Sequence, residues 1–341
     1  MTVVRRFLQA TLAAASLSAS AQAQEVTLKV HHFLPPTSYA QTTFIQPWCE
    51  KIARESNNRL KCQIFPSMQL GGSPPQLIDQ VRDGLADVVW TLPGYTAGRF
   101  PRVEVFELPF MMQNPEATSK ALWDYVQQYA PDEFKGVRPL AFHVHGDGVF
   151  HMVGKPIRTL ADFKGLKVRA PTRQTNKLLA ALGATPVAMP VPQVGDALSK
   201  GVIDGAVVPY EVVPAVKINE LVKFHSETDP AEPAFYTSAF IFAMNPARYE
   251  SLPADLKRII DANSGQALSG QVGKAFLAAD AEGKKLTLRN THNVIPKEEL
   301  ANWRKVAQPV TDAWVAEMNA KGANGQQLLE GARALIARHA K

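Results

Sequence analysis

The segment LIDQVRDGLADVVW (residues 77–90) has the same shape as VGDALSKGVIDGAVV (residues 194–208). In both, a helical pattern ends at a glycine, Gly84 or Gly201, and glycine is the residue that most often follows the last turn of a helix. An aspartate stands three places further on, and an apolar strand pattern follows it. The repeat predicts two similar α/β lobes, although helix-to-strand turns are common and the likeness could also be a coincidence.

Strand and helix patterns alternate on both sides of these segments. Apolar runs predict strands, and apolar residues at helical spacing predict helices between them. The expected strands are residues 26–33, 59–65, 87–92, 138–144, 149–153, 166–170 and 204–209, and the expected helices are residues 39–56, 74–86 and 174–182. Strands that are separated by helices of this length pair in parallel, so the pattern predicts an α/β fold.

The last third of the chain is mostly helical. FYTSAFIFAMN (residues 235–245) predicts a strand, and Pro253 then opens a helical pattern that continues to about Arg289. A single helix of about 35 residues would be about 50 Å long, which is enough to brace two lobes. Two more helices are expected, at residues 297–320 and 325–339.

The composition is that of an ordinary globular protein with room for about two domains. Of the 341 residues, 46% are apolar and 20% are charged. The net charge of +6 comes from scattered lysines and arginines. Nucleic-acid binding is not expected, because it would require a basic stripe with interleaved aromatic residues.

The N-terminus has the pattern of a cleaved secretory signal, predicted over residues 1–23. Arg5 and Arg6 precede a short apolar run, residues 7–17, and Ala21-Gln22-Ala23 offers a cleavage site. The apolar run is too short to span a bilayer. The mature chain is therefore expected to begin near Gln24 and to be a soluble periplasmic protein.

The chain has two cysteines, Cys49 and Cys62. Cys49 lies on a helical pattern and Cys62 on the strand that follows it, and the two elements would run back alongside each other. A disulfide is expected in an oxidising compartment. Two buried free thiols are the alternative.

Catalytic signatures are not found. The chain contains neither a Gly-x-Ser-x-Gly nor a His-Glu-x-x-His motif. The histidine pairs at residues 31–32 and 143–145 could ligate a metal, but alternating strand histidines more often have structural roles. We therefore expect no enzyme activity, no metal and no cofactor.

FKGLKVRAPTR (residues 163–173) places Arg169 near the end of a strand. A guanidinium is rarely buried without a partner, and no acidic residue occurs between Asp162 and Asp196. Arg169 therefore faces water, pairs with a distant part of the chain, or binds an anion from outside. Ligands of open α/β folds sit at strand ends, and Thr172 or Thr175 could cap a helix there that offers free N–H groups.

Several segments resemble the substrate-binding proteins of TRAP (tripartite ATP-independent periplasmic) transporters. They are PSMQLGGSPPQLIDQVRDGLADVV, LADFKGLKVRAPTRQTNKLLAALGATPVAMP, ALSKGVIDGAVVP and the helix after LPADLKRII, and the most specific is DFKGLKVRAP (residues 162–171). The resemblance implies that Arg169 forms a salt bridge with the carboxylate of an organic acid. It also implies a two-lobed periplasmic binding protein fold, with hinge strands and a long helix that spans both lobes.

The same resemblance implies the lobe boundaries and the partners. Lobe I would comprise residues 25–147 and 236–275, and lobe II residues 148–235 and 276–341. The lobes would close over the ligand by a hinge movement. The closed protein, expected to be a monomer, would dock on the membrane subunits of a TRAP permease.

The resemblance also indicates the cleft and the kind of ligand. The expected binding residues besides Arg169 are Phe33, Trp90, His145, Phe150, Thr172, Asn176, Pro209, Tyr210 and Phe235. HGDGVFHM (residues 145–152) lacks the second arginine of many sugar-acid binders, and Val208 stands where asparagine is common. We therefore expect an aromatic or apolar monocarboxylate, such as benzoylformate, mandelate or a branched 2-oxo acid.

Alternatives to this interpretation stay open. Phe150 and Trp90 could belong to the lobe cores, as aromatic strand residues usually do. Glu211 is the one candidate for a metal beside a 2-oxo acid. The chain could also serve a periplasmic sensory system, or be a periplasmic enzyme that uses the same cleft.

Overall fold

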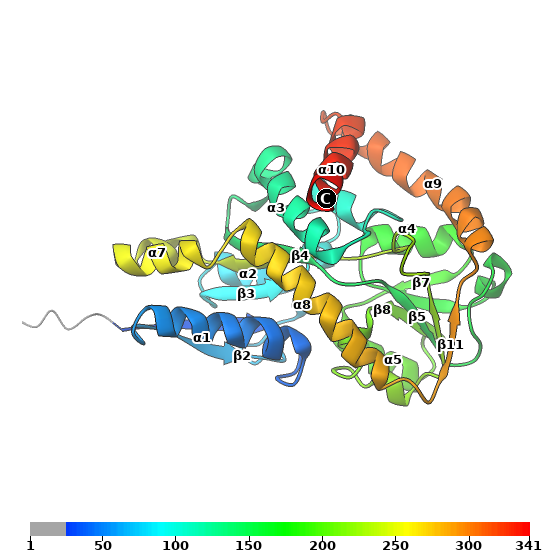
Figure 1. Cartoon of the computed structure of the whole chain (residues 1–341), viewed down its shortest axis with the longest axis horizontal. Helices are drawn as coiled ribbons and strands as arrows, with labels where there is room; N and C mark the ends of the chain where they lie inside the picture. The colour runs from blue at the N-terminus through cyan, green and yellow to red at the C-terminus, as the bar shows by residue number, and fades with distance from the viewer. Residues whose placement is uncertain (1–24) are drawn as a thin grey trace, which may run out of the picture.

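The computed structural model describes residues 25–341 and contains two β-sheets, each at the centre of one lobe (Figure 1). The first sheet has the strand order β2 (Leu60–Phe65), β1 (Val26–His32), β3 (Val88–Thr91), β10 (Ala239–Met244) and β4 (Arg138–Val144). The second has the order β7 (Thr185–Ala188), β6 (Lys167–Ala170), β8 (Gly205–Val208), β5 (Val149–Met152), β9 (Phe224–Glu227) and β11 (Thr291–Val294). The predicted two-lobed α/β fold is confirmed. The expected signal sequence, residues 1–23, lies outside the described residues.

Ten α-helices of the described chain surround the sheets. They are α1 (Gln46–Glu55), α2 (Leu77–Arg82), α3 (Pro115–Tyr129), α4 (Arg173–Ala181), α5 (Val194–Ser199), α6 (Pro246–Glu250), α7 (Ala254–Ala262), α8 (Gln266–Lys285), α9 (Lys297–Ala320) and α10 (Gly325–His339). Short helical turns link several of them, among them η1 (Ala40–Ile45), η4 (Val103–Glu107) and η8 (Tyr210–Val212). Between residues 25 and 341 no helix is long and apolar enough to cross a membrane.

The two repeated segments occupy equivalent places in the two sheets. One forms α2 and β3, and the other forms α5 and β8. Strand β3 lies between parallel β1 and antiparallel β10, and β8 lies between parallel β6 and antiparallel β5. The aspartates have the same role: the Lys29 N–H donates to Asp87 Oδ2 at 2.8 Å, and the Lys167 N–H donates to Asp204 Oδ2 at 2.7 Å. The prediction of two similar lobes is confirmed by this shared geometry.

The sheets are mixed because the chain crosses between the lobes. It leaves the first lobe after β4 and enters the second at β5, and it returns after β9 to enter the first at β10. β5 and β10 each pair antiparallel with both of their neighbours. The expectation of parallel pairing therefore holds for β1 with β2 and β3 and for β6 with β7 and β8, and not for β5 and β10, which follow a crossing.

The single long helix expected from Pro253 to Arg289 is wrong, because it is broken at Gly265. This residue has φ +90°, a conformation that side chains other than glycine rarely adopt. Its N–H donates to the carbonyl oxygen of Leu140 at 2.7 Å, and the Trp48 indole N–H donates to the carbonyl oxygen of Asn263 at 2.8 Å. The break thus separates α7 from α8 and ties the connection to the first lobe.

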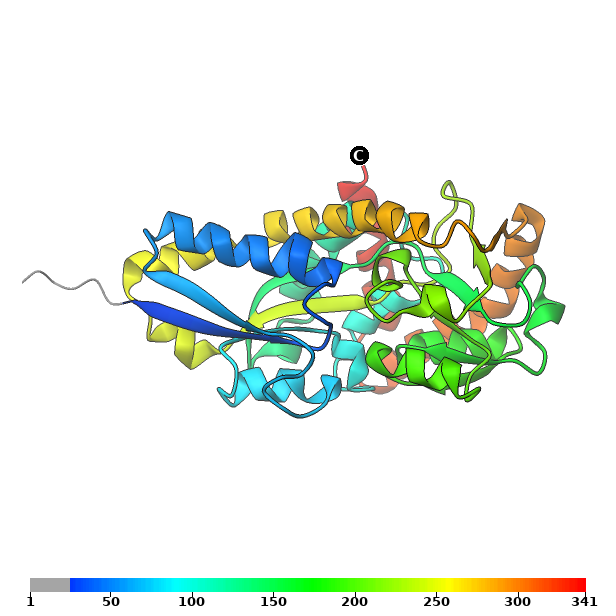
Figure 2. The ribbon, with the colours of Figure 1, turned by 90° about the horizontal axis from the view of Figure 1, so that it is seen from below.

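Helix α8 still spans both lobes, as the family resemblance implied. It packs on α3 and β4 of the first lobe and on η8, which follows β8 of the second (Figure 2). Helix α9 then packs on α4, and α10 packs on α3 and η4 (Figure 1). Helix α10 thus lies against the first lobe, although the predicted boundaries place residues 276–341 in lobe II. The other predicted lobe boundaries stay a prediction.

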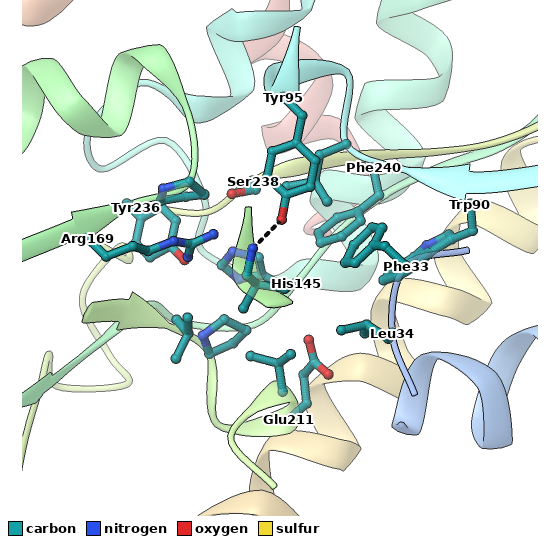
Figure 3. A pocket seen from close by; sticks show the side chains of 16 residues that line it. Phe33, Leu34, Trp90, Tyr95, His145, Arg169, Glu211, Tyr236, Ser238 and Phe240 are labelled. Atoms are coloured by element: carbon teal, nitrogen blue, oxygen red, sulfur yellow. Dashed lines mark hydrogen bonds between the residues drawn. The ribbon is translucent and has the colours of Figure 1, made fainter. Parts of the chain in front are cut away.

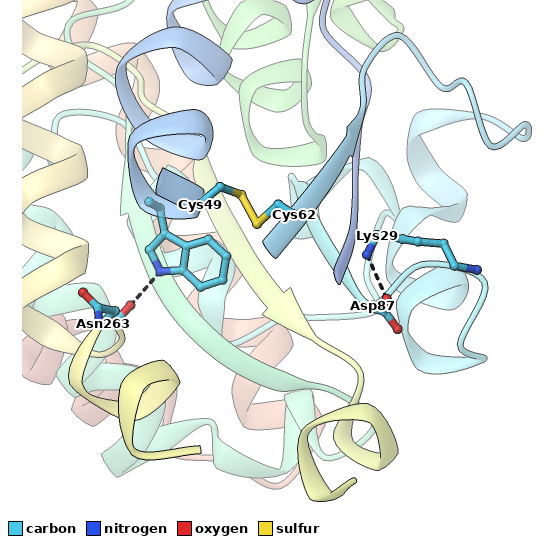
Figure 4. Close-up of a disulfide and its surroundings, with 6 residues drawn as sticks. Lys29, Cys49, Cys62, Asp87 and Asn263 are labelled. Carbon is cyan, nitrogen blue, oxygen red and sulfur yellow. Dashed lines mark hydrogen bonds between the residues drawn. A yellow bond between two sulfur atoms is a disulfide. The ribbon is translucent and has the colours of Figure 1, made fainter. Parts of the chain in front are cut away.

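A disulfide joins Cys49 of α1 to Cys62 of β2 (Figure 4). The S–S distance is 2.20 Å and the Cα atoms are 5.7 Å apart. Parallel pairing of β1 with β2 brings the strand beneath the helix that precedes it. The bond therefore closes the first helix onto the edge strand of its sheet.

Candidate functional site

Arg169 lies on β6, next to the edge strand β7 of the second sheet, and is buried, with 2% of its surface exposed. It pairs in register with Val187 of β7 and Ala206 of β8. Its Nε–H donates to the carbonyl oxygen of Met189 at 2.9 Å, and its Nη1–H donates to that of Val207 at 3.1 Å. These bonds hold the guanidinium in one orientation.

The charge of Arg169 has no acidic partner in the part of the chain that the structure describes. The Nη2 atom has no hydrogen-bond partner there at all. The acidic residues near the start of α4 are Glu104 and Glu317, and both form ion pairs with Arg173. A buried charge is costly unless it is paired. The unpaired guanidinium therefore has the property expected of a group that binds an anion from outside the chain.

A cavity of about 340 Å³ lies between the lobes in front of Arg169 (Figure 3). This volume includes space that is open to solvent. Aromatic rings line it: Phe33 stacks on Trp90 with ring centroids 5.0 Å apart, and Trp90 stacks on Phe240 at 4.9 Å. Tyr95 and Tyr236 complete this lining. The cavity is therefore an aromatic pocket with a cation at one side.

His145 reaches the cavity from the crossing between β4 and β5. Its Nδ1 lies 2.7 Å from the carbonyl oxygen of Gly146, and this contact assigns the proton to Nδ1. Burial, together with the nearby Arg169 charge, lowers the pKa of His145 to about 4. The ring is thus neutral, and its unpaired Nε2 presents a lone pair that can accept a hydrogen bond.

Glu211 is the carboxylic acid in the cavity wall, and 3% of its surface is exposed. Its Oε2 atom has no hydrogen-bond partner among residues 25–341. Burial, and secondarily the neighbouring Asp280, raises the pKa of Glu211 well above its usual value. Burial at the cavity wall therefore favours the protonated form of this side chain.

The structure separates the predicted site residues into two groups. The cavity is lined by Arg169, Phe33, Trp90, His145 and Pro209. The others have structural contacts: Phe150 stacks on Phe235 at 4.5 Å in the core of the second lobe, Asn176 Nδ2–H donates to the carbonyl oxygen of Thr172 at 2.7 Å, and the Tyr210 hydroxyl lies 3.1 Å from His292 Nδ1. For Phe150, the alternative of a core position agrees with the structure.

The structure also places residues at the cavity that the sequence did not single out. They are Leu34, Pro171, Val212, Ser238 and Phe240. Phe240 belongs to a uniformly apolar strand, and nothing in that pattern tells which of its residues faces the cavity. Between residues 25 and 341 no three His, Cys, Asp or Glu side chains are grouped so that they could hold a metal ion.

An ion-pair network connects the two lobes beside the cavity. Arg173, at the start of α4, pairs with Glu104 of η4 and donates from Nη1 to Glu317 Oε2 of α9 at 2.7 Å. Gln174 Nε2–H donates to Glu104 Oε2 at 2.6 Å. Since η4 packs on β10 of the first lobe and α4 on β6 of the second, this network joins the two sides of the cleft.

Comparison with known proteins finds solved structures that are similar over almost the whole chain. A solved structure of a TRAP solute-binding protein from Rhodoferax ferrireducens, in complex with copurified benzoate, is 55% identical, covers 92% of this chain and 98% of that one, and has a TM-score of 0.91. Another, from a marine metagenome and in complex with 3-hydroxybenzoate, is 44% identical, covers 93% and 100%, and also has a TM-score of 0.91.

A more distant structure has the same fold. It is a TRAP periplasmic solute-binding protein from Bordetella bronchiseptica with bound (R)- and (S)-mandelate; it is 29% identical, covers 92% of this chain and 99% of that one, and has a TM-score of 0.84. The model of the DctP family, described as bacterial extracellular solute-binding protein, family 7, matches residues 30–318. The chain therefore belongs to the DctP family of bacterial extracellular solute-binding proteins.

Proposed function

We propose that this chain is the substrate-binding subunit of a TRAP transporter and that it binds aromatic monocarboxylates. The observation that carries the proposal is Arg169, a buried cation that lacks an acidic partner in the described chain and faces an aromatic cavity. Its free Nη2–H can donate a charge-assisted hydrogen bond to a carboxylate. The benzoate, 3-hydroxybenzoate and mandelate in the three similar structures are ligands of this kind.

The lining of the cavity favours a ligand with one carboxylate and an apolar body. Arg169 is the only lysine or arginine in the lining that the structure describes, so a second carboxylate would have no counter-ion. Burying about 150 Å² of aromatic surface would contribute roughly 4 kcal/mol to binding. Sugar acids carry many hydroxyl groups that phenylalanine and tryptophan side chains cannot satisfy.

The family relationship supports a role in uptake rather than catalysis. Members of this family are solute-binding proteins. We infer that the protein acts in the periplasm, closes over its ligand and docks on the membrane subunits of a permease. The network around Arg173 supports the closing step, because its ion pair with Glu104 joins an element of the second lobe to an element of the first.

A ligand screen tests the proposal directly. The chain from Gln24 onward is titrated calorimetrically with benzoate, mandelate, benzoylformate and 4-methyl-2-oxopentanoate, with succinate and gluconate as controls, and melting curves are recorded in parallel. A ligand at 100 times its dissociation constant should stabilise the protein by about 2.7 kcal/mol. Stabilisation by succinate or gluconate, with none by the aromatic acids, would contradict the proposal.

A further inference from the structure

Glu211 is a buried acid whose side chain the fold does not use. Its Oε2 has no partner in the described part of the protein, and Figure 3 shows the carboxyl group pointing into the cavity. Buried polar groups are nearly always hydrogen-bonded, and exceptions call for an explanation. At a ligand cavity, the explanation is a partner that the ligand supplies.

The position of Glu211 is held by its backbone. The Glu211 N–H donates to Asp280 Oδ1 of α8 at 2.8 Å. A Cβ atom at Gly283 would lie 2.1 Å from the carbonyl oxygen of Tyr210, so this glycine allows α8 to lie directly against η8. Asp280 thus satisfies the main chain of Glu211 and leaves the side chain free to enter the cavity.

The chemical state of Glu211 determines which ligand group it can meet. Burial and, secondarily, Asp280 raise the pKa of Glu211 and so favour its protonated form, which has one O–H donor and one C=O acceptor. A neutral acid does not repel a ligand carboxylate bound at Arg169. A protonated carboxyl group does not form an ion pair with a cation, but it can both donate a hydrogen bond to a hydroxyl group and accept one from it.

Figure 3 shows Glu211 and Arg169 on different sides of the cavity, with the aromatic rings beside them. An aromatic acid whose carboxylate meets Arg169 would project its ring away from the arginine. A substituent on the ring carbon next to the one that carries the carboxylate would stay near Arg169. A substituent at a more distant ring position would extend toward the other walls of the cavity.

We propose that Glu211 is a second polar anchor of the pocket, and that its carboxyl group pairs with a ring hydroxyl that is not adjacent to the ligand carboxylate. The preferred ligands are then hydroxylated aromatic monocarboxylates. This inference rests on the proposed binding of aromatic acids at Arg169.

The test compares benzoate with 2-, 3- and 4-hydroxybenzoate by calorimetry. The measured quantity is the ratio of the dissociation constant of benzoate to that of each hydroxybenzoate, so general effects of a substitution on binding cancel. For the unaltered chain we expect a ratio of about ten or more for the 3- or the 4-hydroxy isomer, and no such gain for the 2-hydroxy isomer.

Three variants assign the gain to Glu211. Glu211→Leu removes both hydrogen-bonding functions and should bring the ratio to within about twofold of one. Glu211→Gln keeps a donor and an acceptor and should retain most of the ratio. Glu220→Leu, at an exposed glutamate of the same lobe, is the matched control and should leave the ratio unchanged.

The outcomes separate this inference from the proposed function. If benzoate binds the unaltered chain as tightly as every hydroxybenzoate, the role of Glu211 is refuted and the binding of aromatic acids stands. A ratio that persists in Glu211→Leu also refutes it. If none of the four acids binds, the proposed function is refuted and the inference falls with it.

Discussion

Replacing Arg169 by alanine should abolish tight binding without unfolding the protein. The guanidinium is 2% exposed, its Nε and Nη1 are held by backbone carbonyl groups, and Nη2 is free for a ligand. Removing one partner of a buried, hydrogen-bonded charge pair costs about 2–5 kcal/mol. The dissociation constant of benzoate should therefore rise by about 30-fold to 4000-fold.

The stability of the empty protein should change little in the same variant. The substitution leaves the carbonyl groups of Met189 and Val207 without their donor, but it also removes a buried charge without a counter-ion. These effects oppose each other, so the melting temperature should stay within about 5 °C of the unaltered value.

Calorimetric titration with benzoate and thermal melting of the ligand-free protein measure the two quantities. Arg169→Lys keeps the charge but lacks the planar fork, and should lose part of the affinity. Arg158→Ala, at an exposed arginine of the same lobe, is the control and should bind normally. Binding of benzoate by Arg169→Ala within about threefold of the unaltered chain would refute the role of this side chain.

Two further predictions concern closure and pH. Arg173→Met removes the ion pair with Glu104 that joins the lobes, and should raise the dissociation constant of benzoate about tenfold, whereas Lys200→Met, in an exposed pair within one lobe, should not. Burial raises the pKa of Glu107 and of Asp280 to about 8, so the folded protein binds more protons than the unfolded chain between their ordinary values and 8. This stability is complete below their ordinary pKa values, declines as the pH rises above them, and is lost once the pH passes about 8. The melting temperature should therefore fall between about pH 7 and about pH 8 and level off above that, and a rise would contradict the assignment.

Local patterns in the sequence were sufficient for the lobes and most of their elements. The spacing of apolar residues and the glycine-aspartate turns depend on residues that are neighbours in the chain, and for this reason the two repeated segments identified two equivalent units. Helix α3, the edge strands β7 and β11, and strand β9 beside β11 were not singled out. The strands are short, and an edge strand has a weaker apolar pattern than a central one.

The break at Gly265 shows why the long helix was predicted incorrectly. The apolar pattern continues from α7 into α8, so the sequence indicates one helix. The break exists because the Gly265 N–H meets the carbonyl oxygen of Leu140, which lies far away in the chain. A tertiary hydrogen bond has no signature in the local periodicity.

The binding site, too, could be predicted from the sequence in part, and the tertiary structure decided the rest. The sequence shows that the strand carrying Arg169 has no acidic residue close to it in the chain. Arg169 could therefore face water, pair with a distant part of the chain, or bind an external anion. Only folding settles such a choice, because it brings the carbonyl groups of Met189 and Val207 to the guanidinium while the acids of neighbouring elements pair elsewhere. The orientation of Glu211 is likewise set by Asp280, 69 positions away, because burial and hydrogen bonding depend on distance in space rather than along the chain.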